Sequence, residues 1–104
     1  MTNWFVNKEE IKNKTINAIM SEFEALIDEE SNVWSFNYWL DNAHNVFAII
    51  NDNGMDDRWI EIHYELYDHN EDMIADLLVL DTEDVNRKEL LKEVTTIVDA
   101  YYGD

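Results

Sequence analysis

Apolar residues near the start of the chain recur every three or four positions. Over residues 8–29 they fall at Ile16, Ile19, Met20, Phe23, Leu26 and Ile27. This spacing lines one face of a helix. Asn7 precedes the segment and Glu10 lies three residues further on, an arrangement that resembles a capping box. The pattern therefore predicts a helix over 8–29.

The same spacing returns near the end of the chain, over residues 90–101. The apolar positions there are Leu91, Val94, Ile97, Val98 and Tyr101. Asp81, Thr82 and Asp84 are candidate N-caps. Gly103 follows the last periodic residue, where glycine commonly ends a helix. We expect a second helix that closes the chain.

Between the two helices lie four short runs rich in Val, Ile, Tyr, Phe and Trp, which is typical of strands. The runs are 33–40, 45–51, 58–67 and 73–80. The breaks between them are rich in turn-forming residues and cover 41–44, 52–56 and 68–71. Asn53-Gly54 is the strongest hairpin signal, because both residues tolerate a positive φ. Short breaks imply antiparallel neighbours, so we predict an α+β fold: a four-stranded antiparallel meander sheet flanked by an N-terminal and a C-terminal helix.

Alternation along the third run, 58–67, assigns its side chains to two faces of the sheet. One face receives Ile60, Ile62, Tyr64 and Leu66, and the other receives Trp59, Glu61, His63, Glu65 and Tyr67. Two helices can cover one face of a sheet. We expect the second face, which carries the two glutamates, to be open to solvent or to a partner.

The length of 104 residues suits one domain, so 1–104 is treated as a single unit. Hydrophobic residues make up 46% of the chain, enough to form a core. There is no cysteine, which excludes disulfides and cysteine-based zinc sites. No apolar run approaches the roughly 18 residues that span a bilayer, and the first twenty residues do not resemble a signal peptide. We expect a cytoplasmic protein with no membrane partner.

The formal net charge of −17 arises from 24 acidic and seven basic residues. Segments 1–14 and 87–104 together hold six acids and six bases, whereas 15–86 holds eighteen acids and one base, Arg58. This field repels nucleic acid and anionic membranes, so it favours a cationic protein as partner. Solubility is satisfied by a net charge of about 2 to 8. The charge of this chain exceeds that range, which favours a binding role for the acids. The simpler alternative is that the acidic surface has no binding role.

Residue patterns that carry catalysis or bind metals are missing from the sequence. The histidines are His44, His63 and His69, and no two of them are spaced four residues apart on a helix, as a zinc-binding pair would be. Two glycines are too few for a phosphate-binding loop, and a calcium loop centred on Gly54 would need ligands at Ile49 and Ile60. We expect no metal, no cofactor and no catalytic residue, and predict that the protein is not an enzyme.

A candidate contact set combines the open face of the third run with the turn and strand that follow. It comprises Trp59, Glu61, Glu65, Tyr67, Asp68, Glu71, Asp72 and Asp76. Trp and Tyr among carboxylates favour binding of arginine, through cation–π stacking beside ion pairs. In the alternative interpretation, these aromatic residues pack against the segment 4–6.

A small, strongly acidic α+β domain without a catalytic motif resembles the phage-encoded DNA mimics that inhibit CRISPR or restriction systems. The resemblance covers size, charge and charge placement, and it assigns no residue. It implies an inhibitor that binds, one-to-one or as a dimer, the basic nucleic-acid groove of a defence nuclease in the host cytoplasm.

Two alternatives remain open. An immunity protein that neutralises a basic nuclease toxin has the same electrostatic requirements. A small acidic secretion chaperone would instead bind its client through apolar grooves. The concentration of acids in 15–86 favours the inhibitor and the immunity protein over the chaperone.

Overall fold

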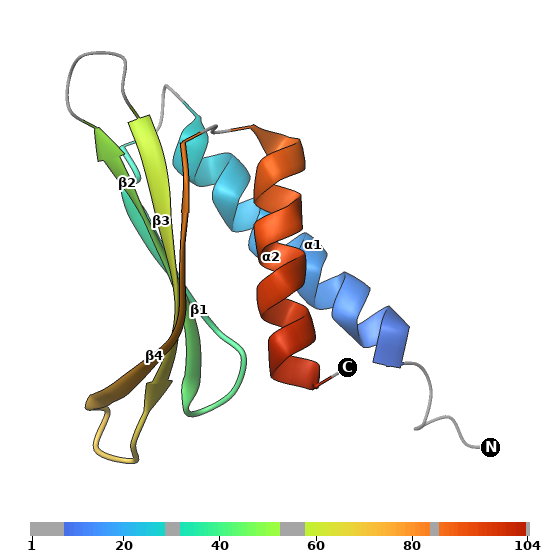
Figure 1. Ribbon diagram of the computed structural model, residues 1–104, viewed down its shortest axis with the longest axis vertical. Helices are drawn as coiled ribbons and strands as arrows, with labels where there is room; N and C mark the ends of the chain where they lie inside the picture. Colours follow the sequence, from blue (N-terminus) through green and yellow to red (C-terminus); the bar gives the residue numbers. More distant parts are fainter. Residues whose placement is uncertain (1–7, 29–31, 53–57, 84–85, 104) are drawn as a thin grey trace.

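The computed structural model describes residues 8–28, 32–52, 58–83 and 86–103. Its elements are α1 (Lys8–Ile27), β1 (Ser35–Trp39), β2 (His44–Asp52), β3 (Arg58–Tyr67), β4 (Met73–Thr82) and α2 (Arg87–Tyr102). The strands form one antiparallel sheet in the order β1-β2-β3-β4, and both helices lie against the same face of it (Figure 1). The predicted α+β meander flanked by two helices is confirmed.

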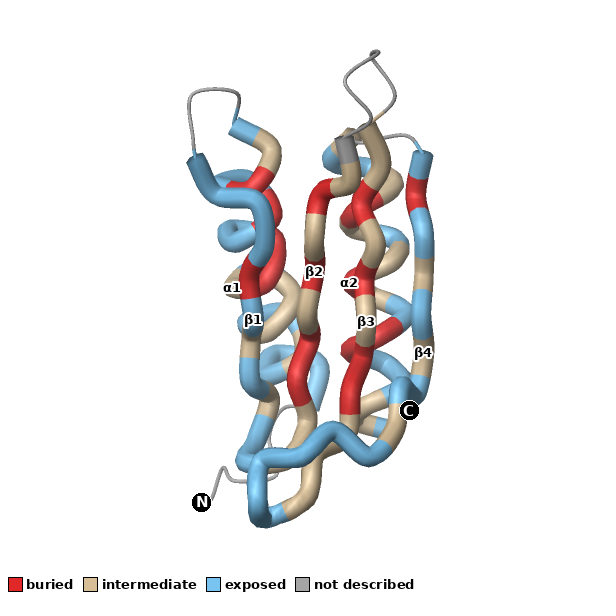
Figure 2. The backbone as a smooth tube through the Cα atoms, turned by 90° about the vertical axis from the view of Figure 1, so that its left-hand side faces the viewer, coloured by how far each residue is buried: buried red, intermediate tan, exposed pale blue. Residues whose placement is uncertain are grey.

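The hydrophobic core lies between the helices and this face of the sheet. The helices contribute Ile19, Met20, Phe23, Leu26, Leu90, Val94, Ile97 and Val98, and the central strands contribute Val46, Ala48, Ile50, Ile60, Ile62 and Tyr64. Buried positions alternate along β2 and β3 (Figure 2). Burying one large aliphatic or aromatic side chain is worth about 1.5–3 kcal/mol. This apolar layer therefore holds both helices on one side of the sheet.

The ends of α2 illustrate how local chemistry sets a helix boundary. Asn86 is the N-cap, and its side-chain oxygen accepts a hydrogen bond from the backbone N–H of Glu89 at 2.8 Å. The predicted N-caps Asp81 and Thr82 are wrong, because β4 continues to Thr82 and the helix begins five residues later. Gly103 ends the helix with φ 72°, as predicted, and donates its N–H to the carbonyl oxygen of Asp99. The candidates Asn7 and Asp84 lie outside the described residues.

The strand pattern is confirmed with shifted boundaries. The first strand is shorter than the predicted 33–40, whereas β2 and β4 each extend beyond the predicted ends. Two register shifts in the pairing of β3 with β4 interrupt the simple alternation, so that Glu65 pairs with Asp76 and Tyr67 with Met73. Shifts of this kind insert extra residues and bend an edge strand. The hairpin signal Asn53-Gly54 lies outside the described residues.

Among the described residues, neither helix is both long and apolar enough to cross a membrane.

Candidate protein-binding face

The sheet face opposite the helices is called the open face. Figure 2 looks onto this face, with both helices behind the sheet. Its side chains include Asn37, Trp39, Asn45, Phe47, Asn51, Trp59, Glu61, His63, Glu65, Tyr67, Asp76 and Val79. The alternation predicted for β3 is confirmed at Ile60, Ile62 and Tyr64, which are buried beneath the helices. The two glutamates accordingly lie on the open face.

One cross-strand chain of hydrogen bonds joins acids and amides in the middle of this face. Asn51 Nδ2 donates to Glu61 Oε2 at 2.9 Å, and His63 Nε2 lies 2.8 Å from Glu61 Oε1. His63 Nδ1 lies 3.4 Å from Asp76 Oδ1. Desolvation acts to lower the pKa of His63, but hydrogen bonds and the charges of Glu61 and Asp76 raise it above its ordinary value. When protonated, the imidazole bridges and partly neutralises two predicted contact residues.

Glu65 is only 7% exposed, although it lies on the open face. Its Oε1 accepts hydrogen bonds from Asn45 Nδ2 at 2.9 Å and from the Tyr67 hydroxyl at 2.8 Å. The hydrogen bond to Glu65, followed by desolvation, raises the pKa of Tyr67. The interpretation of Glu65 as a solvent-facing acid is therefore corrected. Neighbouring strands bury its carboxylate, and buried carboxylates require such donors.

These two arrangements are together called the central network: Asn45, Asn51, Glu61, His63, Glu65 and Asp76. Within it, His63, Glu65 and Asp76 bring potential metal-ligand atoms within 4.8 Å of one another. Both nitrogens of His63 already face carboxylates. One oxygen of Glu65 already accepts two hydrogen bonds. An imidazolium bridge between strands produces the same spacing, so we do not propose a metal site.

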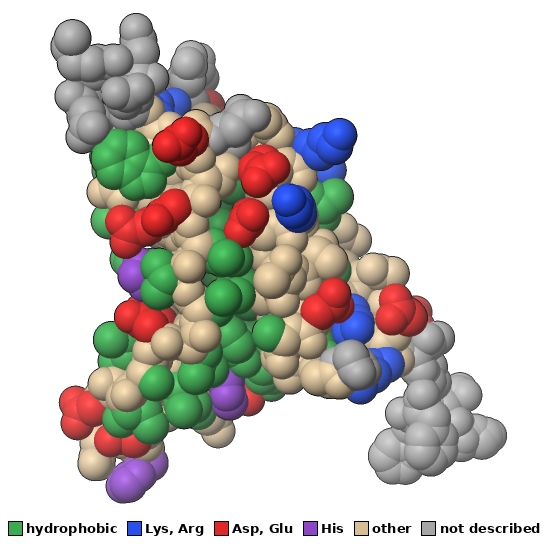
Figure 3. Space-filling model, in the orientation of Figure 1, with side chains coloured by type: hydrophobic (Ala, Val, Ile, Leu, Met, Phe, Trp, Pro, Cys, Tyr) green, Lys and Arg blue, Asp and Glu red, His purple; other side chains and the backbone are tan. Residues whose placement is uncertain are grey.

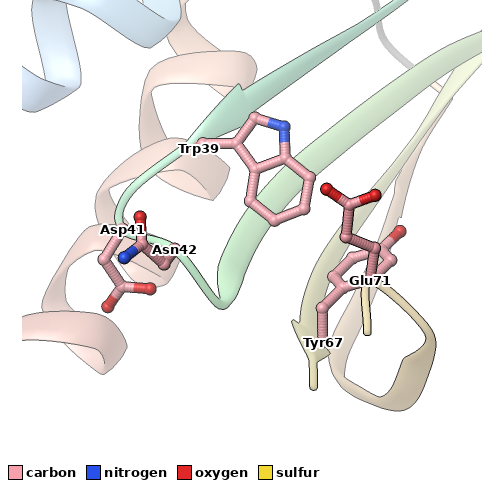
Figure 4. A pocket seen from close by; sticks show the side chains of 5 residues that line it. All are labelled: Trp39, Asp41, Asn42, Tyr67 and Glu71. Carbon is pink, nitrogen blue, oxygen red and sulfur yellow. The ribbon is translucent and has the colours of Figure 1, made fainter. Parts of the chain in front are cut away.

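A pocket of about 220 Å³ lies at the end of the open face, where β1 and β3 finish. It is called the end pocket and is lined by Trp39, Asp41, Asn42, Tyr67 and Glu71 (Figure 4). The rings of Trp39 and Tyr67 are 5.0 Å apart between centroids and are tilted by 55°. Trp39 is 49% exposed. Exposed aromatic surface beside carboxylates is typical of a protein-binding site.

Asp41 has a structural role in this pocket. Its Oδ1 accepts the backbone N–H groups of Ala43 at 2.7 Å and His44 at 2.8 Å, and its Oδ2 accepts the Tyr101 hydroxyl at 2.7 Å. Burial acts to raise its pKa, but hydrogen bonds from Ala43, His44 and Tyr101 hold the pKa well below its usual range. The same bond to Asp41 raises the pKa of Tyr101 to about 12. Asp41 thus ties the β1–β2 turn to α2.

The turn between β3 and β4 presents the remaining predicted contact residues. Asp68 Oδ1 accepts the backbone N–H groups of Asn70 at 2.8 Å and Asp72 at 3.1 Å, so its side chain shapes the turn. Glu71 has φ 69°, in the left-handed region. Glu71 and Asp72 are exposed. The turn therefore offers two accessible carboxylates on a backbone that Asp68 fixes.

The structure brings the predicted contact set onto one face and its adjoining turn, with unequal accessibility. Glu71, Asp72 and Asp76 are exposed, whereas Glu65 is buried. The remaining members, each partly exposed, are Trp59, Glu61, Tyr67 and Asp68. The predicted set omitted Trp39, Asp41 and Asn42. They precede Tyr67 by more than twenty residues, and only the strand register shows that they lie beside it.

Most of the basic residues lie in the helical layer of the molecule. Six of the seven are in α1 and α2. One of them, Lys12 of α1, forms an ion pair with Asp99 of α2, with 3.0 Å between Nζ and Oδ1. In Figure 3, most of the basic side chains lie over the helices, while acidic side chains also lie along the sheet and its turns. The two layers therefore differ in charge as well as in secondary structure.

Comparison with protein families, curated proteins and solved structures found no match to this chain.

Proposed function

We propose that this protein is an inhibitor that binds the basic nucleic-acid groove of a partner protein through its open face and the turn 68–72. The partner class is a defence nuclease of the host, the complex is one-to-one or dimeric, and it forms in the cytoplasm. No catalysis by this chain is involved. The proposal depends on the separation of charge between the two layers of the fold.

That separation is large. The segment 32–83, which holds the sheet and its turns, contains twelve acids and one base, Arg58. The two helices contain seven acids and six bases and are therefore almost neutral. Like charges gathered on one side reduce the stability of the folded chain, through repulsion that a cationic partner would relieve. Duplex DNA presents one charge per roughly 1.7 Å of its axis, so a groove that binds DNA is complementary to such a surface.

Charge of this kind acts mainly on the rate and specificity of association. Complementary fields can raise association rates by about 10–10³-fold, and the gain falls with added salt. Affinity then requires desolvated anchors, commonly aromatic residues. Trp39 on the open face and Trp34 just before β1 are each about half exposed. The sheet side thus supplies both the field and candidate anchors.

The chaperone alternative is favoured by one observation. Edge strand β4 exposes the apolar side chains of Met73, Ile74, Leu77 and Val79. A client bound there by apolar burial would be held almost independently of salt. Salt dependence consequently separates the chaperone from the inhibitor, while an immunity protein would share the behaviour of the inhibitor and differ only in its target.

The test uses tagged full-length protein to capture partners from bacterial lysate at about 50 mM salt, with elution at about 500 mM. A captured protein is then purified, bound to labelled duplex DNA and titrated with this protein. We expect displacement of the DNA near equimolar ratio, and loss of displacement at high salt. Capture that survives high salt, with no effect on DNA binding, would instead indicate a chaperone.

Charge reversal locates the binding surface. Glu71→Lys with Asp72→Lys changes two exposed acids of the turn, and we expect it to abolish displacement. Glu10→Lys with Glu22→Lys makes the same change in charge on exposed positions of α1 and serves as the control. Glu65 is unsuitable for this test, because reversing a buried charge would unfold the sheet. Equal loss in both double variants would show that total charge, rather than the open face, determines binding.

A further inference from the structure

The geometry points to a binding site for an arginine side chain of the partner, in the end pocket formed by Trp39, Tyr67 and Glu71. This inference rests on the proposed function, because it names the group of a basic partner that one end of the open face receives. The ligand class is a guanidinium cation on a protein surface.

Tyr67, one of the two aromatic residues of the pocket, is held by hydrogen bonds before a ligand arrives. The Tyr67 hydroxyl donates to Glu65 Oε1 at 2.8 Å, and the backbone N–H of Tyr67 donates to the carbonyl oxygen of Ala43 at 2.8 Å. The tilted rings of Trp39 and Tyr67 form a corner rather than a closed stack. A cation lying on the face of such a ring, within about 6 Å of its centroid, is attracted to it. A tyrosine ring that is already held in position reduces the ordering cost of binding.

Glu71 supplies the negative charge. It enters the pocket from the β3–β4 turn, and Figure 4 shows its carboxylate on the side of Tyr67 that faces Trp39. Among the described residues, none donates a hydrogen bond to this carboxylate. Glu71 also adopts φ 69°, where glycine or asparagine is much more favourable than glutamate. Glu71 is exposed, and its carboxylate accepts no hydrogen bond from the described residues. An unfavourable backbone conformation at such a residue indicates a role for its side chain.

The other acid of the pocket cannot substitute for Glu71. The carboxylate of Asp41 points away from both rings in Figure 4 and accepts hydrogen bonds from Ala43, His44 and Tyr101. Asp41 therefore adds negative field without a direct contact. A single available carboxylate beside two aromatic rings suits arginine better than lysine, because the planar guanidinium can both stack and donate two parallel hydrogen bonds.

The probe is Nα-acetyl-arginine amide, titrated into the full-length protein while the indole N–H signals of the four tryptophans are followed by NMR. Trp39→Phe identifies the signal of Trp39. We expect a saturable shift of that signal, with a dissociation constant of about millimolar order. Nα-acetyl-lysine amide should bind more weakly. The neutral citrulline amide, which has nearly the same shape, should cause no shift.

Variants separate the carboxylate from the fold. Glu71→Gln should weaken arginine binding by about tenfold or more. Glu71→Gly should do the same while folding at least as well, because glycine suits the positive φ. Glu22→Gln, an equal change of charge at an exposed position of α1, should leave the titration unchanged. Equal shifts with citrulline, no shift with arginine, or unchanged binding by Glu71→Gln would each overturn the site.

The two proposals fail in different ways. If arginine amide does not bind but a basic protein is still displaced from DNA, the end pocket is not an arginine site and the inhibitor remains. If arginine amide binds as expected but no nucleic-acid-binding protein is inhibited, the pocket stands and the inhibitor proposal is wrong.

Discussion

The central network and the end pocket occupy the same face and use the same residue types in opposite ways. In the central network, Asn45, Asn51 and His63 engage the carboxylates of Glu61 and Glu65, and the hydroxyl of Tyr67 from the end pocket also donates to Glu65. In the end pocket, two aromatic rings lie beside the accessible carboxylate of Glu71. Acids that the fold already satisfies stabilise the sheet, whereas Glu71, to which no described residue donates a hydrogen bond, is available to another molecule.

The strongest test of this comparison is Glu65→Ala, which removes a carboxylate that the fold uses. The buried amide of Asn45 and the partly exposed hydroxyl of Tyr67 would both lose this acceptor. We expect a loss of about 2–3 kcal/mol in the free energy of unfolding, because unsatisfied buried polar groups cost about 1–3 kcal/mol each. The measurement is urea unfolding followed by circular dichroism.

Asp72→Ala is the matched control on the adjoining turn. Asp72 is exposed, so its replacement should change the free energy of unfolding by no more than about 0.5 kcal/mol. Equal stability of the two variants would mean that Glu65 is not a structural residue and that the distinction between the two regions is unfounded.

Asp41→Asn should have the next largest effect, because Asp41 belongs to the end pocket but is used by the fold. The asparagine side chain has one acceptor oxygen where aspartate has two. The variant therefore loses at least one of the hydrogen bonds that Asp41 accepts from Ala43, His44 and Tyr101. We expect a cost of about 1–2 kcal/mol. Asn42→Ala in the same turn should cost less than about 0.5 kcal/mol.

The pH dependence of Asp41→Asn follows from its lowered pKa. A carboxyl group whose pKa is lower in the folded chain stabilises it above the ordinary pKa of 3.8, and this contribution is lost as pH falls. The unfolding free energies of wild type and Asp41→Asn should therefore converge in acid below about pH 4. A constant difference at all pH values would show that the negative charge of Asp41 contributes nothing.

Glu71→Gly changes the acid whose carboxylate accepts no hydrogen bond from the described part of the chain. Relief of the left-handed strain should raise the free energy of unfolding by up to about 1 kcal/mol, reduced by the greater freedom of glycine in the unfolded chain. Asp72→Gly is the control, because Asp72 does not have a positive φ and should gain nothing. Urea unfolding of both variants measures the difference, and destabilisation by Glu71→Gly would show that the Glu71 side chain supports the turn.

The sequence predicted the elements of this fold well, because helix and strand periodicities are local properties. Alternation along β3 correctly assigned Glu61, Glu65 and their neighbours to the open face. It did not reveal the burial of Glu65, which depends on Asn45 lying directly opposite in β2. Nor did it indicate the N-cap Asn86, which competed with several equally suitable polar residues.

The end pocket was only half visible from the sequence, for a similar reason. Tyr67 was predicted as a contact residue because alternation places it on the open face with Glu61 and Glu65, and Glu71 because it lies in the turn that follows. Trp39 comes from the other side of β2, so its contact with Tyr67 follows from two strand registers, those of β1 with β2 and of β2 with β3. Registers are set by the whole sheet, and one strand alone does not determine them.

Replacement of His63 should have the smallest effect on stability. Its comparison with His69 distinguishes a histidine of the central network from an exposed one. Its pKa is raised in the folded chain despite desolvation, through Glu61 and Asp76, so protonated His63 stabilises the fold fully below its unfolded pKa of about 6.5. This contribution disappears as pH rises through the higher pKa of the folded state. The stability difference between wild type and His63→Gln should therefore shrink as pH rises. His69→Gln makes the same substitution at an exposed position of the β3–β4 turn and serves as the control. NMR titration measures the pKa of His63 directly. A pKa below 6.5 would show that desolvation outweighs the attraction of Glu61 and Asp76, and that the histidine does not balance the charge of these carboxylates.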